Sequence, residues 1–204
     1  MSYKTTATND ILIRSVLKGI LEKRHSQDKK VKIIEELGVQ NGNARIDIAI
    51  VNGIMHGYEI KSDLDTLRRL QEQITIFNSV FDKMTIFVGK SHLYEAIRTV
   101  PEWWGIMMAK VDINGSVIFN TIREEEINKD QDKISVAKLL WRAEALKILD
   151  EINEANGLRS KPKDFIYRKL SDILDQKTLG EKVRETLFFR ADWRPDAPLI
   201  QNGD

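Results

Sequence analysis

The chain of 204 residues contains no cysteine and only 4 prolines and 11 glycines. Without cysteine there is no disulfide framework, no thiolate zinc site, no iron–sulfur cluster and no cysteine nucleophile. So few prolines and glycines exclude collagen-like and linker-dominated architectures. Charged residues also interrupt the first 25 residues, so the start of the chain offers no apolar run for a signal peptide or membrane span. We therefore expect a cytoplasmic protein that does not contact a membrane.

A charge excess of one sign is missing too. Lysine and arginine total 32 and aspartate and glutamate total 31, which gives a formal net charge of +1. The basic composition typical of nucleic-acid-binding proteins is therefore absent overall. The hydrophobic fraction of 42% is too high for a disordered chain and, at this length, is typical of one domain with a sizeable core.

The pattern of apolar residues predicts an α/β protein. Helical spacing predicts a helix over residues 10–24 and another that begins near Leu64, capped by Ser62 or Asp63. Alternating or apolar runs predict strands at 30–37, 44–51, 54–61, 83–89, 104–111 and 116–122, with a short helix at 92–100. After Arg123 the pattern is almost wholly helical, with helices expected at 136–154, 163–174 and 179–190.

This order predicts a mixed central β-sheet flanked by helices, followed by a C-terminal helical extension. We place the core at residues 1–123, the helical extension at 124–194 and a tail at 195–204. The helices after Val136 allow two interpretations. They could form a DNA-binding module or a dimerising module, and the second would allow a homodimer. Alternatively, they could pack as a helical cap on the sheet.

A hairpin around Asn52-Gly53 decides which polar side chains meet. If Val51 pairs with Ile54, Glu59 falls on the apolar face of the hairpin, where its burial is costly. If Val51 pairs with Met55, Asp47 lies directly opposite Glu59, and the isoleucines occupy the other face. A turn with Gly53 in a left-handed position gives this second register, which we predict.

Two carboxylates about 5 Å apart on neighbouring strands repel one another unless a cation lies between them. Asp47 and Glu59, with the backbone carbonyl of Ile60 and water, make an oxygen ligand set that suits Mg²⁺ or Mn²⁺. Lys61 on the same face could orient an attacking water or stabilise developing phosphate charge. These are the parts needed for metal-assisted hydrolysis of a phosphodiester.

The arrangement resembles the PD-(D/E)XK nuclease superfamily, with the aspartate at Asp47 and the E-x-K element at Glu59-Ile60-Lys61. The longer pattern ELG–ARIDIAIVNG–HGYEIKSDLDTLRRLQEQ–VFDKMTIFVG–VPEWWGI, followed by LLWRAEAL, is similar to one uncharacterised bacterial family within it. This resemblance spans residues 31–190. It implies a restriction-endonuclease-like core and a metal-dependent nuclease acting on nucleic acid, with DNA favoured and RNA left open.

The resemblance also implies further site residues. Superfamily members often add an acidic ligand before the aspartate, and here Glu36 or Glu35 is the candidate, although both lie at a strand end rather than on the first helix. Gln73 on the following helix fits a polar site position, and an ordinary exposed position is an equal alternative. Arg69, one turn earlier, and Arg45 are candidate phosphate contacts, with the helix or strand surface as the alternative for each.

Two functional hypotheses follow from different classes. The first is a metal-dependent nuclease in which Asp47, Glu59 and Lys61 carry the chemistry. The second is a non-catalytic module of the same fold that binds nucleic acid or protein. In both, the polar face of the hairpin is the place to examine.

Overall fold

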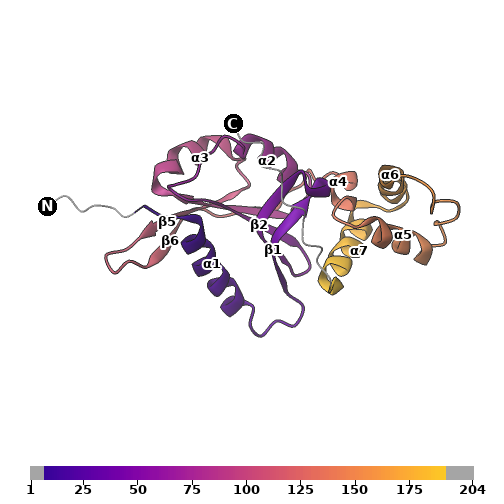
Figure 1. Ribbon diagram of the computed structural model, residues 1–204, viewed down its shortest axis with the longest axis horizontal. Coiled ribbons are helices and arrows are strands. Elements are labelled where there is room, and N and C mark those ends of the chain that lie inside the picture. The colour runs from indigo at the N-terminus through magenta and orange to yellow at the C-terminus, as the bar shows by residue number, and fades with distance from the viewer. Residues whose placement is uncertain (1–6, 192–204) are drawn as a thin grey trace. The chain divides into compact units, whose positions relative to one another are not determined.

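The computed structural model describes residues 7–191 and places a mixed sheet at the centre of the first two thirds of the chain (Figure 1). The strands are β1 (Lys32–Val39), β2 (Ala44–Val51), β3 (Met55–Lys61), β4 (Lys83–Gly89), β5 (Gly105–Val111) and β6 (Val117–Arg123). The helices are α1 (Asp10–Arg24), α2 (Leu70–Asn78), α3 (Leu93–Thr99), α4 (Lys133–Ala137), α5 (Arg142–Glu151), α6 (Lys163–Ile173) and α7 (Gln176–Phe189). The predicted α/β fold class with a helical C-terminal region is confirmed.

The six strands form one sheet in chain order, β1-β2-β3-β4-β5-β6. β3 runs parallel to β4 and β4 parallel to β5, whereas β2 pairs with β3 and β5 with β6 in antiparallel fashion. The parallel crossovers carry α2 and α3, as parallel pairs require. Val51 pairs with Met55 and Ile48 with Tyr58, so the predicted hairpin register is confirmed. Gly53 takes a φ of 95°, the left-handed conformation expected in this turn.

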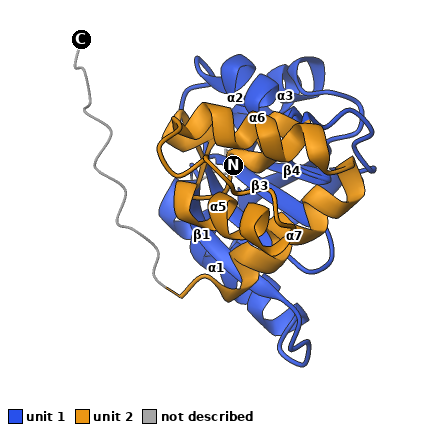
Figure 2. Ribbon diagram, turned by 90° about the vertical axis from the view of Figure 1, so that its right-hand side faces the viewer, with its two compact units in different colours: residues 1–37, 46–132 blue, residues 38–45, 133–204 orange. Residues whose placement is uncertain are grey.

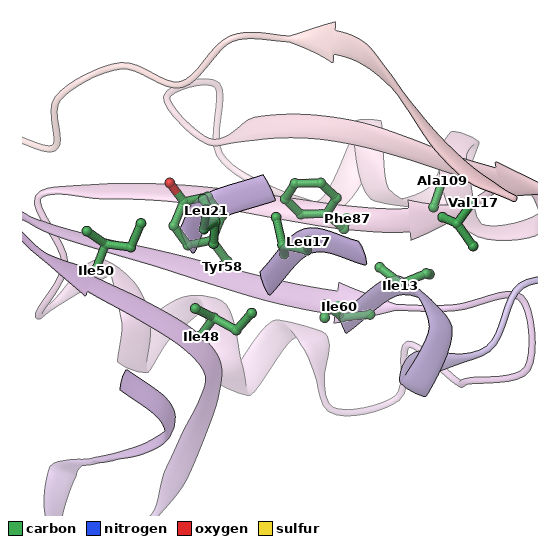
Figure 3. Packing of buried hydrophobic residues seen from close by; sticks show 10 residues of the cluster. All are labelled: Ile13, Leu17, Leu21, Ile48, Ile50, Tyr58, Ile60, Phe87, Ala109 and Val117. Carbon is green, nitrogen blue, oxygen red and sulfur yellow. The ribbon is translucent and has the colours of Figure 1, made fainter. Parts of the chain in front are cut away.

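One face of the sheet is covered by α1. Asn9 caps this helix by accepting a hydrogen bond from the Leu12 amide at 2.9 Å. Figure 3 shows α1 side chains pointing at apolar residues that come from β2, β3, β4, β5 and β6. The members of this core are Ile13, Leu17, Leu21, Ile48, Ile50, Tyr58, Ile60, Phe87, Ala109 and Val117. Because side chains alternate along a strand, burying Ile48 and Ile60 here sends Asp47 and Glu59 away from this core.

The opposite face is covered by α2 and α3 (Figure 1). Phe77 of α2 packs edge-on against Phe81 and stacks near Trp104, with ring centroids 5.9 Å and 6.4 Å apart. Gly57 of β3 lies so close to these residues that an added Cβ would come within 2.5 Å of the Met84 sulfur. The buried Trp104 is thus a core residue, and α2 is held firmly over the polar side of the hairpin.

The start of α2 differs from the sequence-based expectation. The helix begins at Leu70 rather than near Leu64, and neither Ser62 nor Asp63 caps it. Asp63 instead accepts hydrogen bonds from Thr8 and Ser91, while Ser62 donates to Asp65. These bonds hold residues 62–69 in an irregular connection because both candidate caps are already used elsewhere.

The contacts within the chain define two compact units, coloured separately in Figure 2. The first comprises residues 1–37 and 46–132, and the second comprises residues 38–45 and 133–204. The segment 124–132, predicted to be part of the helical extension, belongs to the first unit. Its Asn128 side chain donates to the carbonyls of Asn78 and Phe81, and the amide of Asp132 donates to Ser79. The predicted tail at 195–204 lies outside the described residues.

The second unit has its own buried core. Leu139, Leu149, Ile166, Leu179 and Val183 are buried there. The helix predicted at 136–154 is split into α4 and α5, because Trp141 adopts an extended backbone and its amide donates to Glu144 at 2.7 Å. Within residues 7–191 no helix is long and apolar enough to cross a membrane.

Candidate metal centre

The polar residues singled out in the hairpin gather where Asp47 of β2 lies beside the C-terminal end of β3, next to α1 and α2. The register that pairs Ile48 with Tyr58 would, one step further, set Asp47 opposite Glu59. The backbone pairing ends before that step. Instead, the Asp47 side chain contacts the backbone of β3, because its Oδ2 accepts a hydrogen bond from the Ile60 amide at 2.6 Å. This bond fixes the Asp47 side chain on the hairpin.

Asp47 is surrounded by donors. Besides the Ile60 amide, Oδ1 accepts from the Arg14 guanidinium at 2.5 Å, and the Asp47 carbonyl accepts from the same side chain at 3.2 Å. Only 17% of the Asp47 side chain is exposed. Burial raises the pKa of Asp47 above its ordinary value, although Arg14 and the Ile60 amide act in the opposite direction.

Glu59 is the most deeply buried charged residue of the hairpin, with 2% of its side chain exposed. Its Oε1 accepts from Lys61 Nζ and from Gln73 Nε2, each at 2.7 Å. Burial, and next the nearby Asp47 carboxylate, raise the pKa of Glu59 to about 8. The structure therefore brings Glu59, Lys61 and Gln73 together, and it places Gln73 of α2 within hydrogen-bonding distance of the E-x-K element.

Two oxygens of this group are buried without a hydrogen-bond donor in the described structure. They are Glu59 Oε2 and Gln73 Oε1. A buried carboxylate oxygen without a partner costs of the order of 1–3 kcal/mol or more, and such atoms are rare in folded proteins. Paired carboxylates with spare oxygen ligands have the donor chemistry that a hard divalent cation needs.

Arg14 and Asp10 join the site without having been predicted. Arg14 on α1 contacts the carboxylates of Asp10, Glu36 and Asp47 at 3.2, 2.6 and 2.5 Å. Burial by itself would lower the Arg14 pKa, but these carboxylates outweigh it and raise that pKa. One guanidinium thus bridges three carboxylates beside the hairpin.

The acidic candidates at the end of β1 point in different directions. Glu36 has a φ of 54°, a left-handed conformation uncommon for glutamate, and its carboxylate meets Arg14. Glu35 instead pairs with Lys18 one turn further along α1. Glu36 is therefore placed at the site and Glu35 outside it, while the first helix supplies Asp10 as a further acidic residue.

The donor set of the hairpin is made of oxygen atoms, the ligand type of a magnesium-type ion. Among residues 7–191 no three histidine, cysteine or acidic side chains converge as a preformed metal cage. Mg²⁺ does not require such a cage, since it is commonly held by one or two carboxylates and keeps several waters. Asp47 and Glu59 are the two carboxylates predicted to bind such an ion, and that role stays a prediction. The role predicted for the Ile60 carbonyl stays a prediction, whereas the Ile60 amide is committed to Asp47.

The two predicted phosphate contacts lie near the site in sequence. Arg69 directly precedes α2 and is exposed, and Arg45 is half-buried in β2, two residues before Asp47. Their contact with a substrate stays a prediction.

The sequence places Asp10 only at the start of the helix predicted over residues 10–24, and gives no reason to count it among the site residues. The available signal is the spacing of Asp10 and Arg14, which are four residues apart and therefore share one helix face. That spacing is common on exposed helices, however, and only the fold shows that this face meets Asp47.

Comparison with solved structures gives two weak similarities. A protein of unknown function from Silicibacter pomeroyi is 18% identical, with 74% of this chain and 94% of that chain covered at a TM-score of 0.39. SfsA of Pyrococcus furiosus, solved in complex with Ca²⁺, is 17% identical, with 62% of this chain and 69% of that chain covered at the same TM-score. Similarity at this level carries no argument about the site.

Comparison with protein sequences is more informative. Protein cII of Enterobacteria phage P4 is 32% identical over 155 residues, which are 75% of this chain. This chain spans about half of that relative, since the match covers 55% of its length. The family model described as bacteriophage P4 protein cII matches residues 4–191. The match includes the hairpin, α1, α2 and the helices of the second unit, so the chain belongs to the bacteriophage P4 protein cII family.

Proposed function

We propose that the protein is a metal-dependent nuclease of the PD-(D/E)XK type that hydrolyses phosphodiester bonds in DNA. The observation that carries this proposal is the buried Glu59 carboxylate. One of its oxygens is bound by Lys61 and Gln73, and the other has no donor within the described structure. A carboxylate kept in this state is costly for the fold, which favours a functional reason for its retention.

Each side chain then has a defined task. Asp47 and Glu59 would hold Mg²⁺ or Mn²⁺, with the Ile60 carbonyl as a third oxygen ligand, and the bound ion supplies Lewis-acid activation of water and phosphate. The Lys61 ammonium would orient the attacking water and stabilise the negative charge that develops on the phosphate. Gln73 fixes the Glu59 carboxylate, because its amide holds the same oxygen as Lys61. Arg45 and Arg69 are the proposed contacts to flanking phosphates.

A cleavage assay tests this function. The protein is incubated with plasmid, linear and branched DNA and with RNA, in Mg²⁺, Mn²⁺ or EDTA. We expect metal-dependent cleavage of DNA, and a decrease of roughly 10²–10³-fold in rate for Lys61→Ala, since one charge-stabilising donor is lost. Lys83→Ala is the matched control, because Lys83 also lies in the sheet and pairs with a glutamate, Glu125, at 3.4 Å.

The same assay defines failure. Activity that survives Lys61→Ala unchanged would indicate a contaminating nuclease. If the wild-type protein cleaves none of the substrates with either metal, the nuclease proposal is wrong.

A non-catalytic module of the same fold is the second candidate. The observation that favours it is Arg14, whose guanidinium already forms ion pairs with Asp47, Glu36 and Asp10. If these ion pairs persist in solution with Mn²⁺ present, the carboxylates would be structural. Calorimetric titration with Mn²⁺ separates the two candidates, because the second predicts no binding that depends on Asp47.

A further inference from the structure

The two units differ in charge although the whole chain is nearly neutral. In the first unit, the described residues (7–37 and 46–132) contain 16 basic and 19 acidic side chains, a net charge of −3. In the second, the described residues (38–45 and 133–191) contain 14 basic and 9 acidic side chains, a net charge of +5. The boundary predicted after Arg123 does not reveal this difference in net charge, because it assigns the acidic segment 124–132 to the helical extension.

The positive charge of the second unit is concentrated where α5 connects to α6. Residues 157–169, GLRSKPKDFIYRK, contain five basic side chains and one acidic side chain. Arg159, Lys161, Lys163 and Arg168 are exposed, whereas Lys169 is paired with Glu154 at 2.9 Å. Exposed cations close together on a surface create a positive potential that attracts anions.

The connection is held in place by the helix before it. The Arg142 guanidinium donates to the carbonyls of Arg159 and Lys161, the latter at 3.2 Å. These bonds bring a further cation, Arg142, beside the loop and fix the course of the loop. We refer to Arg142, Arg159, Lys161 and Lys163 as the basic surface.

An aromatic ring borders the basic surface. Phe165 is 45% exposed, and the Lys161 ammonium lies 5.6 Å from its ring centroid. A polar hollow of about 560 Å³ adjoins the loop, and its wall includes Asn153, Asn156, Arg159 and Ser160, with Asp150 as its carboxylate. Cations, an exposed ring and short polar side chains are the combination that contacts phosphates, bases and sugars in proteins that bind single-stranded nucleic acid.

We propose that the basic surface of the second unit binds single-stranded nucleic acid, with the cations on the phosphates and Phe165 stacked on a base. The proposal rests on the proposed function for the class of partner. It assigns binding to the second unit and chemistry to the first. An anionic membrane is disfavoured by the surface itself, since Phe165 is the apolar side chain identified within it and membrane-surface helices need a broad apolar face.

Binding in EDTA tests the proposal without cleavage. The full-length chain is titrated into a fluorescently labelled single-stranded oligodeoxythymidine at several salt concentrations. The variant Lys161→Ala/Lys163→Ala removes two cations of the basic surface. The matched control Lys147→Ala/Lys177→Ala removes two exposed cations elsewhere on the same unit.

We expect the basic-surface variant to bind roughly tenfold more weakly at low salt, with the slope of log K against log[salt] reduced by about 1.4, at about 0.7 for each phosphate contact on single strands. The control should retain both the affinity and the slope. Phe165→Leu should weaken binding with an unchanged slope, because stacking involves no counterion release.

Equal behaviour of the two double variants would overturn the proposal, as would binding to phosphatidylserine vesicles without binding to the oligonucleotide. The proposed nuclease function fails separately. Loss of binding in the basic-surface variant together with no cleavage by wild type would leave this inference standing and reject the nuclease. Cleavage with unchanged binding in the variant would do the opposite.

Discussion

Buried charged side chains in the two units differ in whether all their polar atoms have partners. In the first unit, Glu59 keeps one oxygen without a donor, and burial, followed by the nearby Asp47 carboxylate, raises its pKa. In the second unit, Arg190 is 4% exposed and fully engaged: it pairs with Glu144, donates to the Leu139 carbonyl at 3.1 Å and lies 4.4 Å from the Trp141 ring centroid. A satisfied buried pair serves the fold, whereas an unsatisfied one is retained at a cost to stability.

The largest effect is expected from breaking the satisfied pair. Arg190→Met should lower the free energy of unfolding by about 3–5 kcal/mol, because it leaves the Glu144 carboxylate without its buried partner. Urea denaturation followed by circular dichroism measures the change. A loss below about 1 kcal/mol would mean that the pair is no more structural than a surface pair, and the contrast between the units would disappear.

Removing the charge of Glu59 should raise the free energy of unfolding, whereas Arg190→Met should lower it. Because the pKa of Glu59 is raised in the folded state from 4.5 to about 8, the folded protein binds more protons than the unfolded chain between these values. Stability in EDTA should therefore fall as pH rises from about 5 to 8. Glu59→Gln should remove this fall and stabilise the metal-free protein at pH 8 by about 1–3 kcal/mol.

Urea denaturation of both proteins across this pH range checks the prediction. Glu151→Gln is the control, since Glu151 is an exposed glutamate whose pKa is lowered by its hydrogen bond with Lys182. A Glu59→Gln variant that is less stable than wild type at pH 8 would show that the carboxylate is structural.

Arg14 offers a way to sharpen the comparison through metal binding. Its guanidinium holds the same Asp47 carboxylate that a cation would need. Arg14→Gln should therefore bind Mn²⁺ roughly tenfold more tightly, which corresponds to about 1.4 kcal/mol, and should gain more thermal stability from the metal than wild type. Isothermal titration calorimetry and thermal melts with and without EDTA measure both effects.

Lys18→Gln is the matched control for Arg14, because Lys18 lies one turn later on α1 and pairs with Glu35 and Glu22. Its Mn²⁺ affinity should stay at the wild-type value. Equal affinities in all three proteins would show that the metal does not compete with Arg14, and weaker binding by Arg14→Gln would reverse the assigned role.

The smallest effect is expected at an exposed pair. Lys182 and Glu151 lie 2.8 Å apart with 33% and 43% of their side chains exposed. Lys182→Met should change the free energy of unfolding by less than about 1 kcal/mol, because exposed ion pairs contribute little. The comparison with Arg190→Met in the same unit then isolates the effect of burial.

The hairpin was predictable because side chains alternate between the two faces of a strand, so each register places Glu59 on either the apolar or the polar face. The requirement to keep Glu59 off the apolar face selected the register with Val51 opposite Met55, which the structure confirms. The start of α2 was not predictable in this way. The local sequence predicts Ser62 or Asp63 as the helix cap. In the structure, Thr8 and Ser91, which are distant in sequence, donate hydrogen bonds to the Asp63 carboxylate.

The candidate site was predictable only as far as the hairpin extends. Asp47, Glu59 and Lys61 lie on two adjacent strands, so sequence spacing places them together, and Gln73 follows on the next helix. Arg14 and Asp10 reach the site by tertiary packing of α1, and no local pattern reports which way a helix face points across a sheet. The unit boundary at residue 132 likewise depends on hydrogen bonds of Asn128 and Asp132 to the distant residues 78–81.

Residues 38–45 belong to the second unit although the chain on both sides of them belongs to the first, and this affects how the chain folds during synthesis. This segment belongs to the second unit, and its Gln40 side chain donates to Ser135, 95 residues later, at 3.3 Å. The ribosome therefore delivers residues 38–45 long before their partners exist, while β1 and β2 on either side are already available. Nascent chains stalled before residue 133 should protect the sheet from proteases and leave the connection between β1 and β2, residues 40–43, open to cleavage.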